Sequence, residues 1–291
     1  MKKQLLLAGL ALISTVAFAQ KKEIKKAEKA LKAKNSTEAL SYVSQAEALI
    51  GGAKDEMKVQ FYLIKGEANL ADAGSDNFAK MKAASEAFKA AEALNPKGDL
   101  VARLGTGKTN LRTALFNSAV NDQKKKDYAT AADKLYLSYM ASKADTSDLY
   151  YAAGSAYTAK KYDMAVDYYE QLLNMGYTGI STTYSAVNKE TGKKDYYATA
   201  NERDLMVKFG THDRPGIEQA TSKTGDILKS LSLAYSETGA TDKAKEAFTK
   251  ARAKDPKNTA LIINEANLYY KLGDNEKFKS LMEEALSLIH I

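Results

Sequence analysis

A repeat with a period of about 34 residues near the C-terminus is the feature that most limits the fold of this chain. Small, aromatic and glycine residues recur there at fixed offsets. One copy places them at Ser232, Tyr235, Gly239, Ala244, Phe248, Ala251 and Pro256. The next copy, one period later, has Ala266, Tyr269, Gly273, Phe278, Met282, Ala285 and His290. A unit this short cannot bury its apolar face alone, so the repeat predicts a solenoid of stacked units.

The residue types within one copy predict two antiparallel helices. Small side chains at Ser232 and Ala244 allow the helices to approach closely, and Tyr235 and Phe248 fill the space between them. Gly239 permits the turn that joins them. Only three prolines occur in 291 residues, which also favours helices over a sheet-rich fold.

Weaker copies precede this pair. One is formed by Gly154, Tyr157, Tyr162, Ala165, Tyr169 and Leu172. Another is formed by Ala119, Ala131, Leu135 and Ser138, with its turn at residues 126–128. A third has Gly66, Ala84, Phe88, Ala91 and Pro96, with a longer turn around residues 72–76. The first and most degenerate copy has Ala27, Ala39, Val43 and Ala46. Six copies exceed the number that a solenoid needs for stability.

This pattern resembles the tetratricopeptide repeat (TPR), a helix-turn-helix unit of about 34 residues. The resemblance covers roughly 85% of the chain after residue 19 and is strongly specific in the last two copies and in the copy at residues 154–172. The sequence is similar to exported TPR proteins of Bacteroidetes. This resemblance implies an all-α, TPR-type α-solenoid that binds other proteins or peptides and is not an enzyme.

Residues 180–224 interrupt the repeats. Segments 183–187 and 195–199 are rich in Tyr, Thr and Val and flank a turn-forming run at 188–192, so they predict a β-hairpin. Residues 202–209 are expected to be helical and 210–224 to form a loop containing Pro215 and Gly216. The expected organisation is a signal peptide (1–19), N-terminal repeats (20–179), an insertion (180–224) and two C-terminal repeats (225–291).

The N-terminal residues have the pattern of a secretory signal. Lys2 and Lys3 precede an apolar run at 5–16, and Ala17 and Ala19 form a cleavage site that would leave Gln20 as the mature terminus. An uncleaved N-terminal anchor is the alternative. We therefore expect export to the periplasm, or to the inner face of the outer membrane, and partners from the cell envelope. No later segment is long and apolar enough to span a membrane, and the absence of cysteine excludes disulfides and a lipid-modified cysteine.

The net charge of +7 is concentrated in one segment. Residues 21–34 contain seven Lys and two Glu, a net charge of 7 − 2 = +5, and the rest is close to neutral. Nucleic-acid binding is therefore not expected, because it requires basic residues spread over a binding face. This segment is either a solvated helix face or a contact to lipid, glycan or another polyanion. The second interpretation gives an alternative function, an accessory factor for envelope assembly, peptidoglycan or the outer membrane.

Residues 102–109 (ARLGTGKT) fit a relaxed Walker A pattern but lack the preceding strand that a phosphate-binding loop needs. We therefore expect no nucleotide site and no other cofactor. The two histidines, His212 and His290, have no neighbouring ligand at metal-binding spacing, so no metal site is predicted. His212 is expected to be solvated. No pair of carboxylates or nucleophile motif indicates catalysis.

The resemblance implies that the first helix of each copy lines a concave groove. The residues on that face that the packing positions leave available are Tyr151, Lys229, Ile263, Asn264, Asn267 and Tyr270. Tyrosine buries a large ring while keeping a polar tip, which makes it a frequent interface residue. The hairpin at 184–199 is the competing surface. Residues 288–291 are not a polar capping helix, so we expect the chain to be part of a longer repeat protein.

Overall fold

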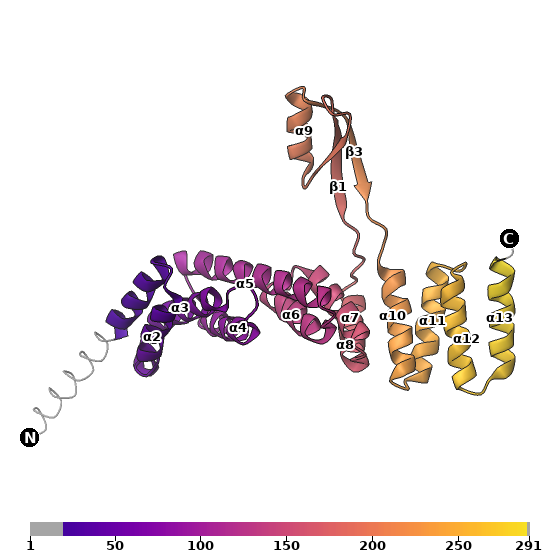
Figure 1. Cartoon of the computed structure of the whole chain (residues 1–291), viewed down its shortest axis with the longest axis horizontal. Helices are drawn as coiled ribbons and strands as arrows, with labels where there is room; N and C mark the ends of the chain where they lie inside the picture. Colours follow the sequence, from indigo (N-terminus) through magenta and orange to yellow (C-terminus); the bar gives the residue numbers. More distant parts are fainter. Residues whose placement is uncertain (1–19, 290–291) are drawn as a thin grey trace, which may run out of the picture. The chain divides into compact units, whose positions relative to one another are not determined.

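The computed structural model describes residues 20–289 (Figure 1). The predicted signal sequence and His290 of the repeat pattern lie outside these residues. The described residues divide into two compact units, residues 20–159 and 160–289, which are described separately.

The first unit consists of helices that follow one another along the chain. Residues 20–32 are helical. They are followed by α2 (Ser36–Glu47), the 3₁₀ turn η1 (Ile50–Gly52), α3 (Asp55–Ala73), α4 (Phe78–Ala93), α5 (Asp99–Lys124), α6 (Tyr128–Ala141) and α7 (Thr146–Thr158). Consecutive helices pack against each other, most extensively α3 with α4, α5 with α6 and α6 with α7.

The second unit combines helices with a small sheet. It contains α8 (Tyr162–Asn174), β1 (Thr182–Asn188), β2 (Lys194–Tyr197), α9 (Ala200–Lys208), β3 (His212–Gln219), α10 (Thr224–Glu237), α11 (Thr241–Lys254), α12 (Thr259–Lys271) and α13 (Asn275–Ile289). Helix pairs α10–α11 and α12–α13 pack as hairpins, and α8 packs on α10. No helix among residues 20–289 has the length and apolar character needed to cross a membrane.

Side-chain caps and glycines set the ends of many helices. Asn35, Asn77 and Asn258 each accept a hydrogen bond from a backbone N–H in the first turn of the following helix, which satisfies a donor that the helix leaves free. Gly239 and Gly273 have φ of +77° and +76° and lie in the turns after α10 and α12. The sequence predicted both glycine turns.

The predicted repeat register is confirmed by burial. Ser232, Ala244 and Phe248 are fully buried, and Ala251 and Tyr235 are nearly so. In the next pair Ala266 and Ala285 are buried with Ile262 and Leu281 in one apolar cluster. Alanines at these positions allow the two helices of a pair to come into close contact.

The first unit has longer helices than the repeat pattern predicts. The expected long turn around residues 72–76 is wrong in its extent, because Asp72 and Ala73 still belong to the 19-residue α3. Only Gly74, with φ of +55°, and the residues up to Asn77 form the turn. Helix α5 has 26 residues, so most of the additional chain in this part extends helices.

Phe88 of α4 fixes how closely α3 and α5 approach. Its ring is 2% exposed and lies between Gly66 of α3 and Gly107 of α5. A Cβ atom at these glycines would come within 2.5 Å and 2.7 Å of the ring, respectively. Both glycines are therefore required by packing, since any side chain would occupy the space of the ring.

The insertion in the second unit is a three-stranded antiparallel sheet in the order β2-β1-β3. The predicted hairpin is present as β1 and β2, with Tyr184 opposite Tyr197. The prediction of a loop over residues 210–224 is wrong, because β3 pairs with β1 and places Ser185 opposite Gly216. Pro215 lies in an edge strand, where a residue without an N–H is tolerated. The Pro-Gly pair therefore indicated a turn although it belongs to a strand.

The segments that lead into β1 and out of β3 are hydrogen-bonded to each other. The Ala220 N–H donates to the Ser181 carbonyl at 2.9 Å, and the Lys223 N–H donates to the Thr178 carbonyl at 2.7 Å. Helix α9 begins with a capping box in which Thr199 and Glu202 satisfy each other's backbone N–H groups. Residues 178–181 and 220–223, which connect the insertion to the repeats, therefore lie side by side, and we call them the paired neck.

Candidate functional site

Tyr151, the predicted binding residue of the first unit, belongs to an aromatic cluster. It lies on α7 with 48% of its surface exposed. Its ring makes edge-on contacts with Phe116 of α5, at 6.1 Å between centroids, and with Tyr150, at 5.6 Å. Sequence reasoning missed Phe116 and Tyr150. Phe116 precedes Tyr151 by 151 − 116 = 35 residues, close to one repeat, but this spacing alone does not show that the two rings meet.

The face of α5 next to this cluster carries two exposed threonines, Thr109 and Thr113. Thr109, Thr113 and Phe116 lie at i, i+4 and i+7, so they share one helix face. The hydroxyls of Thr109 and Thr113 donate to the carbonyls of Gly105 and Thr109, both at 3.0 Å. Because those hydroxyls bond to the helix itself, the face presents methyl groups and an aromatic ring to a ligand.

A groove of about 700 Å³ lies further along the same helix. Its lining includes Val101, Leu104 and Lys108 of α5 and Met140 of α6, with Lys143 after α6. Val101 and Met140 are 52% and 39% exposed. The Lys108 ammonium is paired with Glu92, which also lines this groove.

The predicted residues of the second unit lie on α10 and α12. Lys229 on α10 and Asn264 on α12 are partly exposed, and Asn267 is exposed. Tyr270 is 63% exposed, and its ring lies 5.3 Å from that of Phe278 on α13. Ile263 packs against the apolar cluster of α12 and α13, so part of its side chain is already used in the fold. Tyr151 belongs to the first unit and the other five residues to the second.

The Walker-like segment lies inside α5. Residues 102–109 are all helical, so their backbone N–H groups serve the helix and cannot surround a phosphate as a P-loop does. Gly107 packs on Phe88, and the Lys108 ammonium pairs with Glu92 at 2.8 Å. The two residues of the motif that would matter most to a phosphate therefore have structural explanations.

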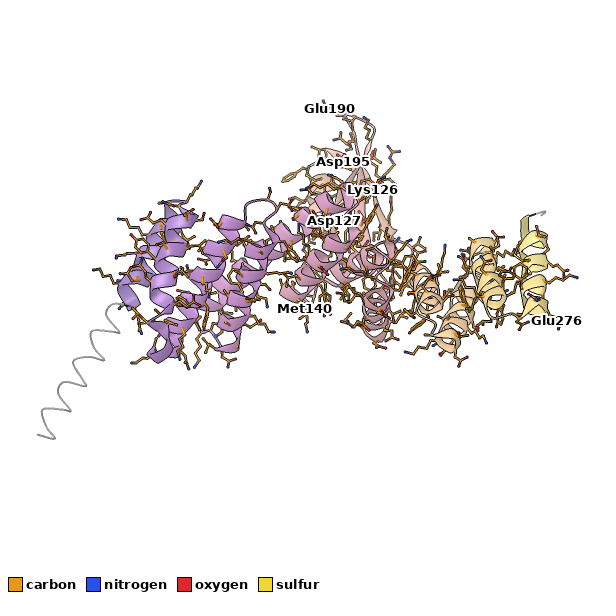
Figure 2. The ribbon with its side chains drawn as sticks, turned by 60° about the horizontal axis from the view of Figure 1, so that its bottom comes forward. Lys126, Asp127, Met140, Glu190, Asp195 and Glu276 are labelled. Carbon is orange, nitrogen blue, oxygen red and sulfur yellow. The ribbon has the colours of Figure 1, made fainter. Side chains whose placement is uncertain are left out.

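His212 is placed differently from the prediction. It is 4% exposed in β3, and its Nε2–H donates to the Asp195 carboxylate at 2.8 Å. Asn188 also donates to Asp195, and the pKa of Asp195 is lowered by these two hydrogen bonds, that of His212 first. Tyr197 lies edge-on to His212, and its pKa is raised by burial and by the charge of Asp195. The cluster joins all three strands. Figure 2 labels Asp195 of β2 and Glu190, which lies in the turn between β1 and β2.

Buried charges in the first unit are held in ion pairs. Lys134, 2% exposed, contacts Asp76 and Asp122, each at 2.7 Å, and also donates to Ser118. Hydrogen bonds from Lys134 and Ser118 hold the pKa of Asp76 far below its usual range. Arg112 pairs with the fully buried Asp148 at 2.8 Å. These groups link neighbouring helices, and we assign them a structural role because their charges are already neutralised.

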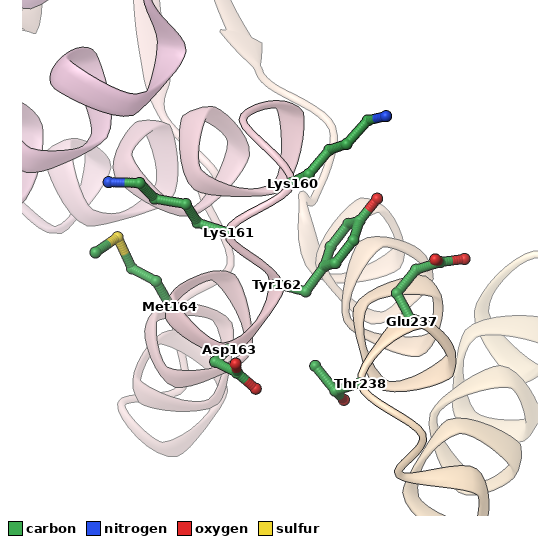
Figure 3. Close-up of a pocket in the computed structure, with 7 residues that line it drawn as sticks. All are labelled: Lys160, Lys161, Tyr162, Asp163, Met164, Glu237 and Thr238. Carbon is green, nitrogen blue, oxygen red and sulfur yellow. The ribbon is translucent and has the colours of Figure 1, made fainter.

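A polar depression of about 450 Å³ lies where α8 begins and α10 ends (Figure 3). Its lining comes from the start of α8, including Tyr162, and from the end of α10, including Glu237. Within residues 20–289, no group of three or more acidic or histidine side chains is arranged to hold a metal ion. The candidate site that we consider further is the surface around Tyr151 of α7, where its ring meets Phe116 and Tyr150.

Comparison with known proteins identifies the type of repeat. Residues 236–288 match the tetratricopeptide repeat family. A search of curated proteins gave no match. Similar solved structures include a TPR protein from Parabacteroides merdae, with 12% identity, coverage of 92% of this chain and 79% of that chain, and a TM-score of 0.36. Another is a signal-transduction ATPase with a TPR sensor from Pyrococcus horikoshii, with 13% identity, coverage of 93% and 36%, and a TM-score of 0.38.

The family match, the confirmed repeat register and the helix pairs establish a TPR-type α-solenoid with a small β insertion. This fold is typical of scaffolds for protein–protein interaction.

Proposed function

We propose that this protein is a periplasmic scaffold that captures a peptide or helix of a cell-envelope protein in the concave groove of its first helices. The observation that carries the proposal is the exposed ring of Tyr151, which packs edge-on against Phe116 beside the threonines of α5. Aromatic rings that protrude from a packed scaffold are frequent interface hot spots. In the second unit, taken by itself, the side-chain amides of Asn264 and Asn267 can bond to backbone groups of an extended peptide.

Substitution of exposed tyrosines distinguishes partner binding in the groove from partner binding by the insertion. Tyr151, Tyr270 and Tyr196 are 48%, 63% and 58% exposed, and only Tyr196 lies in the insertion. Envelope proteins that co-purify with the tagged full-length chain are identified first. Binding of the identified partner to each variant is then measured, with circular dichroism as the folding control. We expect Tyr151→Ala with Tyr270→Ala to weaken binding at least tenfold, about 1.4 kcal/mol, and Tyr196→Ala to leave it unchanged.

Removal of the insertion provides the complementary test. Residues 182–219 can be replaced by a short Gly-Ser linker, because Ser181 and Ala220 are already joined by a hydrogen bond. Full binding by this variant would support binding of the partner in the groove. Loss of binding here, together with normal binding by the tyrosine double variant, would assign the partner to the insertion instead.

A further inference from the structure

The helix at residues 20–32 has one face fixed by the core of the first unit. Ile24, Ala27 and Ala30 are buried in an apolar cluster with residues of α2 and α3, including Val43 and Phe61. Because these positions recur every three residues, the opposite face must point outward. The structure thereby determines which lysines of this segment are presented to solvent.

The acidic residues of the helix are used on its packed side. Glu23 is 14% exposed and accepts from Lys26 at 2.9 Å, and the Lys26 ammonium also lies over the ring of Tyr42. Glu28 pairs with Arg103 of α5 at 3.2 Å. Both carboxylates have closer cationic partners, so Glu28, at 3.9 Å from Lys32, offsets the charge of the outward face only weakly.

The outward face is a row of lysines, which we call the basic stripe: Lys21, Lys25, Lys29 and Lys32. Their spacing of four, four and three residues places them on one side of the helix, over a length of about 16 Å at 1.5 Å per residue. All four are exposed. With the other described residues, Lys21, Lys25 and Lys29 form no ion pair, and Lys32 makes only a 3.9 Å contact to Glu28. Lys22 and Lys34 flank the row and are also exposed.

We propose that the basic stripe binds the surface of a membrane containing anionic phospholipids. A straight row of flexible ammonium groups can reach several headgroups of a flat surface at once, and each lysine near such a surface adds to the attraction. Residues 20–34 contain no arginine and no aromatic residue, the side chains that proteins use to grip phosphate bidentately or to stack on bases.

The test uses the form that starts at Gln20, which keeps every described helix, and repeats each measurement with the full chain. Binding to vesicles of phosphatidylcholine, with or without phosphatidylglycerol, is measured by co-sedimentation. The variant replaces Lys21, Lys25, Lys29 and Lys32 by Gln. The control replaces four exposed lysines elsewhere, Lys89, Lys124, Lys254 and Lys257, with the same change in net charge.

We expect the Gln20 form to bind only the anionic vesicles. The stripe variant should bind at least about 100-fold more weakly, since each lysine contributes about fivefold. The control should bind within about threefold of the wild type, and raising the salt from about 0.15 M to about 1 M should abolish binding. Circular dichroism should be unchanged, because the substituted side chains are exposed.

Three results would overturn the proposal. Equal losses in the stripe variant and the control would show that net charge alone drives the attraction. Equal binding to neutral vesicles would exclude recognition of anionic headgroups. Tighter binding to single-stranded DNA than to the anionic vesicles would assign the stripe to a different polyanion. None of these results bears on capture of a partner in the groove.

Discussion

Gly105 and Gly107 look alike in the sequence, and both belong to the Walker-like segment. In the fold, a Cβ at Gly105 would meet nothing within 4 Å, whereas one at Gly107 would strike the Phe88 ring. That ring cannot retreat, because Gly66 confines it from the other side. The sequence could exclude a phosphate loop from its helical context, but only the structure distinguishes a required glycine from a tolerated one.

We expect Gly107→Ala to destabilise the first unit and Gly105→Ala to stabilise it. Overpacking against a confined ring costs about 1–3 kcal/mol, and the gain in helix propensity of about 1 kcal/mol offsets only part of this. At Gly105 only the propensity gain remains, about 0.5–1 kcal/mol. The midpoints of urea unfolding should move in opposite directions. Shifts of the same sign would contradict the packing that we describe around Phe88.

Asp195→Ala should loosen the insertion while leaving the repeats intact. The substitution removes the acceptor for His212 and Asn188, whereas Glu190→Ala, in the exposed hairpin turn (Figure 2), is the matched control. Hydrogen exchange of the β1, β2 and β3 amides should quicken only in the Asp195 variant. Unchanged exchange would mean that the cluster does not hold the sheet together.

The same contact predicts a pH dependence. The folded pKa of Asp195 is lowered, so its stabilising effect is complete above the unfolded value of about 3.9. It is lost as the pH falls through the lower, folded value. The difference in exchange between wild type and Asp195→Ala should therefore be full at pH 7 and should shrink below about pH 4. A difference that persists in strong acid would indicate a contribution other than charge.

At the scale of elements, the sequence predicted best where small residues bring two helices into close contact. The pairs α10–α11 and α12–α13 follow from Ser232, Ala244 and Ala266 because close helix contact admits few other residue types. Strand β3 could not be predicted in the same way. It is paired on one side only, so its Pro215 and Gly216 are tolerated by the edge, although the same two residues also favour turns.

The register of the C-terminal repeats can be tested with two substitutions in α11. Ala244→Phe should lower the free energy of unfolding by about 1–3 kcal/mol, because Ala244 is fully buried between α10 and α11. Lys250→Ala removes only an exposed i,i+4 pair with Glu246 and should cost at most about 0.5 kcal/mol. Thermal unfolding of both variants compares the effects. Similar shifts would mean that the assigned register is wrong.

At the scale of the molecule, the candidate site was only partly accessible to sequence reasoning. Repeat spacing correctly indicated that Tyr151 and Tyr270 are exposed on first helices. It could not reveal that Ile263 contributes to the core between α12 and α13, or that Phe116 meets Tyr151, since such contacts depend on how neighbouring helices rotate. The lengths of α3 and α5 could not be predicted either, because additional residues can lengthen either a turn or the helices beside it.

Export remains a prediction and has a direct measurement. The signal pattern predicts cleavage after Ala19, so N-terminal sequencing or mass spectrometry of periplasmic extract should give a terminus at Gln20. Cleavage there would retain Gln20, which is buried and donates its side-chain amide to the Leu49 carbonyl. Recovery of the intact chain from the cytoplasm would contradict both export and the periplasmic role.

The paired neck of the insertion has a consequence for how the chain reaches its fold. Helices α8 and α10 must find each other across the whole connection at residues 175–223. Once the sheet forms, the bond from Lys223 to Thr178 shortens this connection to a few residues. The free-energy cost of closing the loop then falls by about 2 kcal/mol. Early formation of the sheet would thus speed the docking of α10 on α8, and the insertion would act as a folding aid for the repeats that it interrupts.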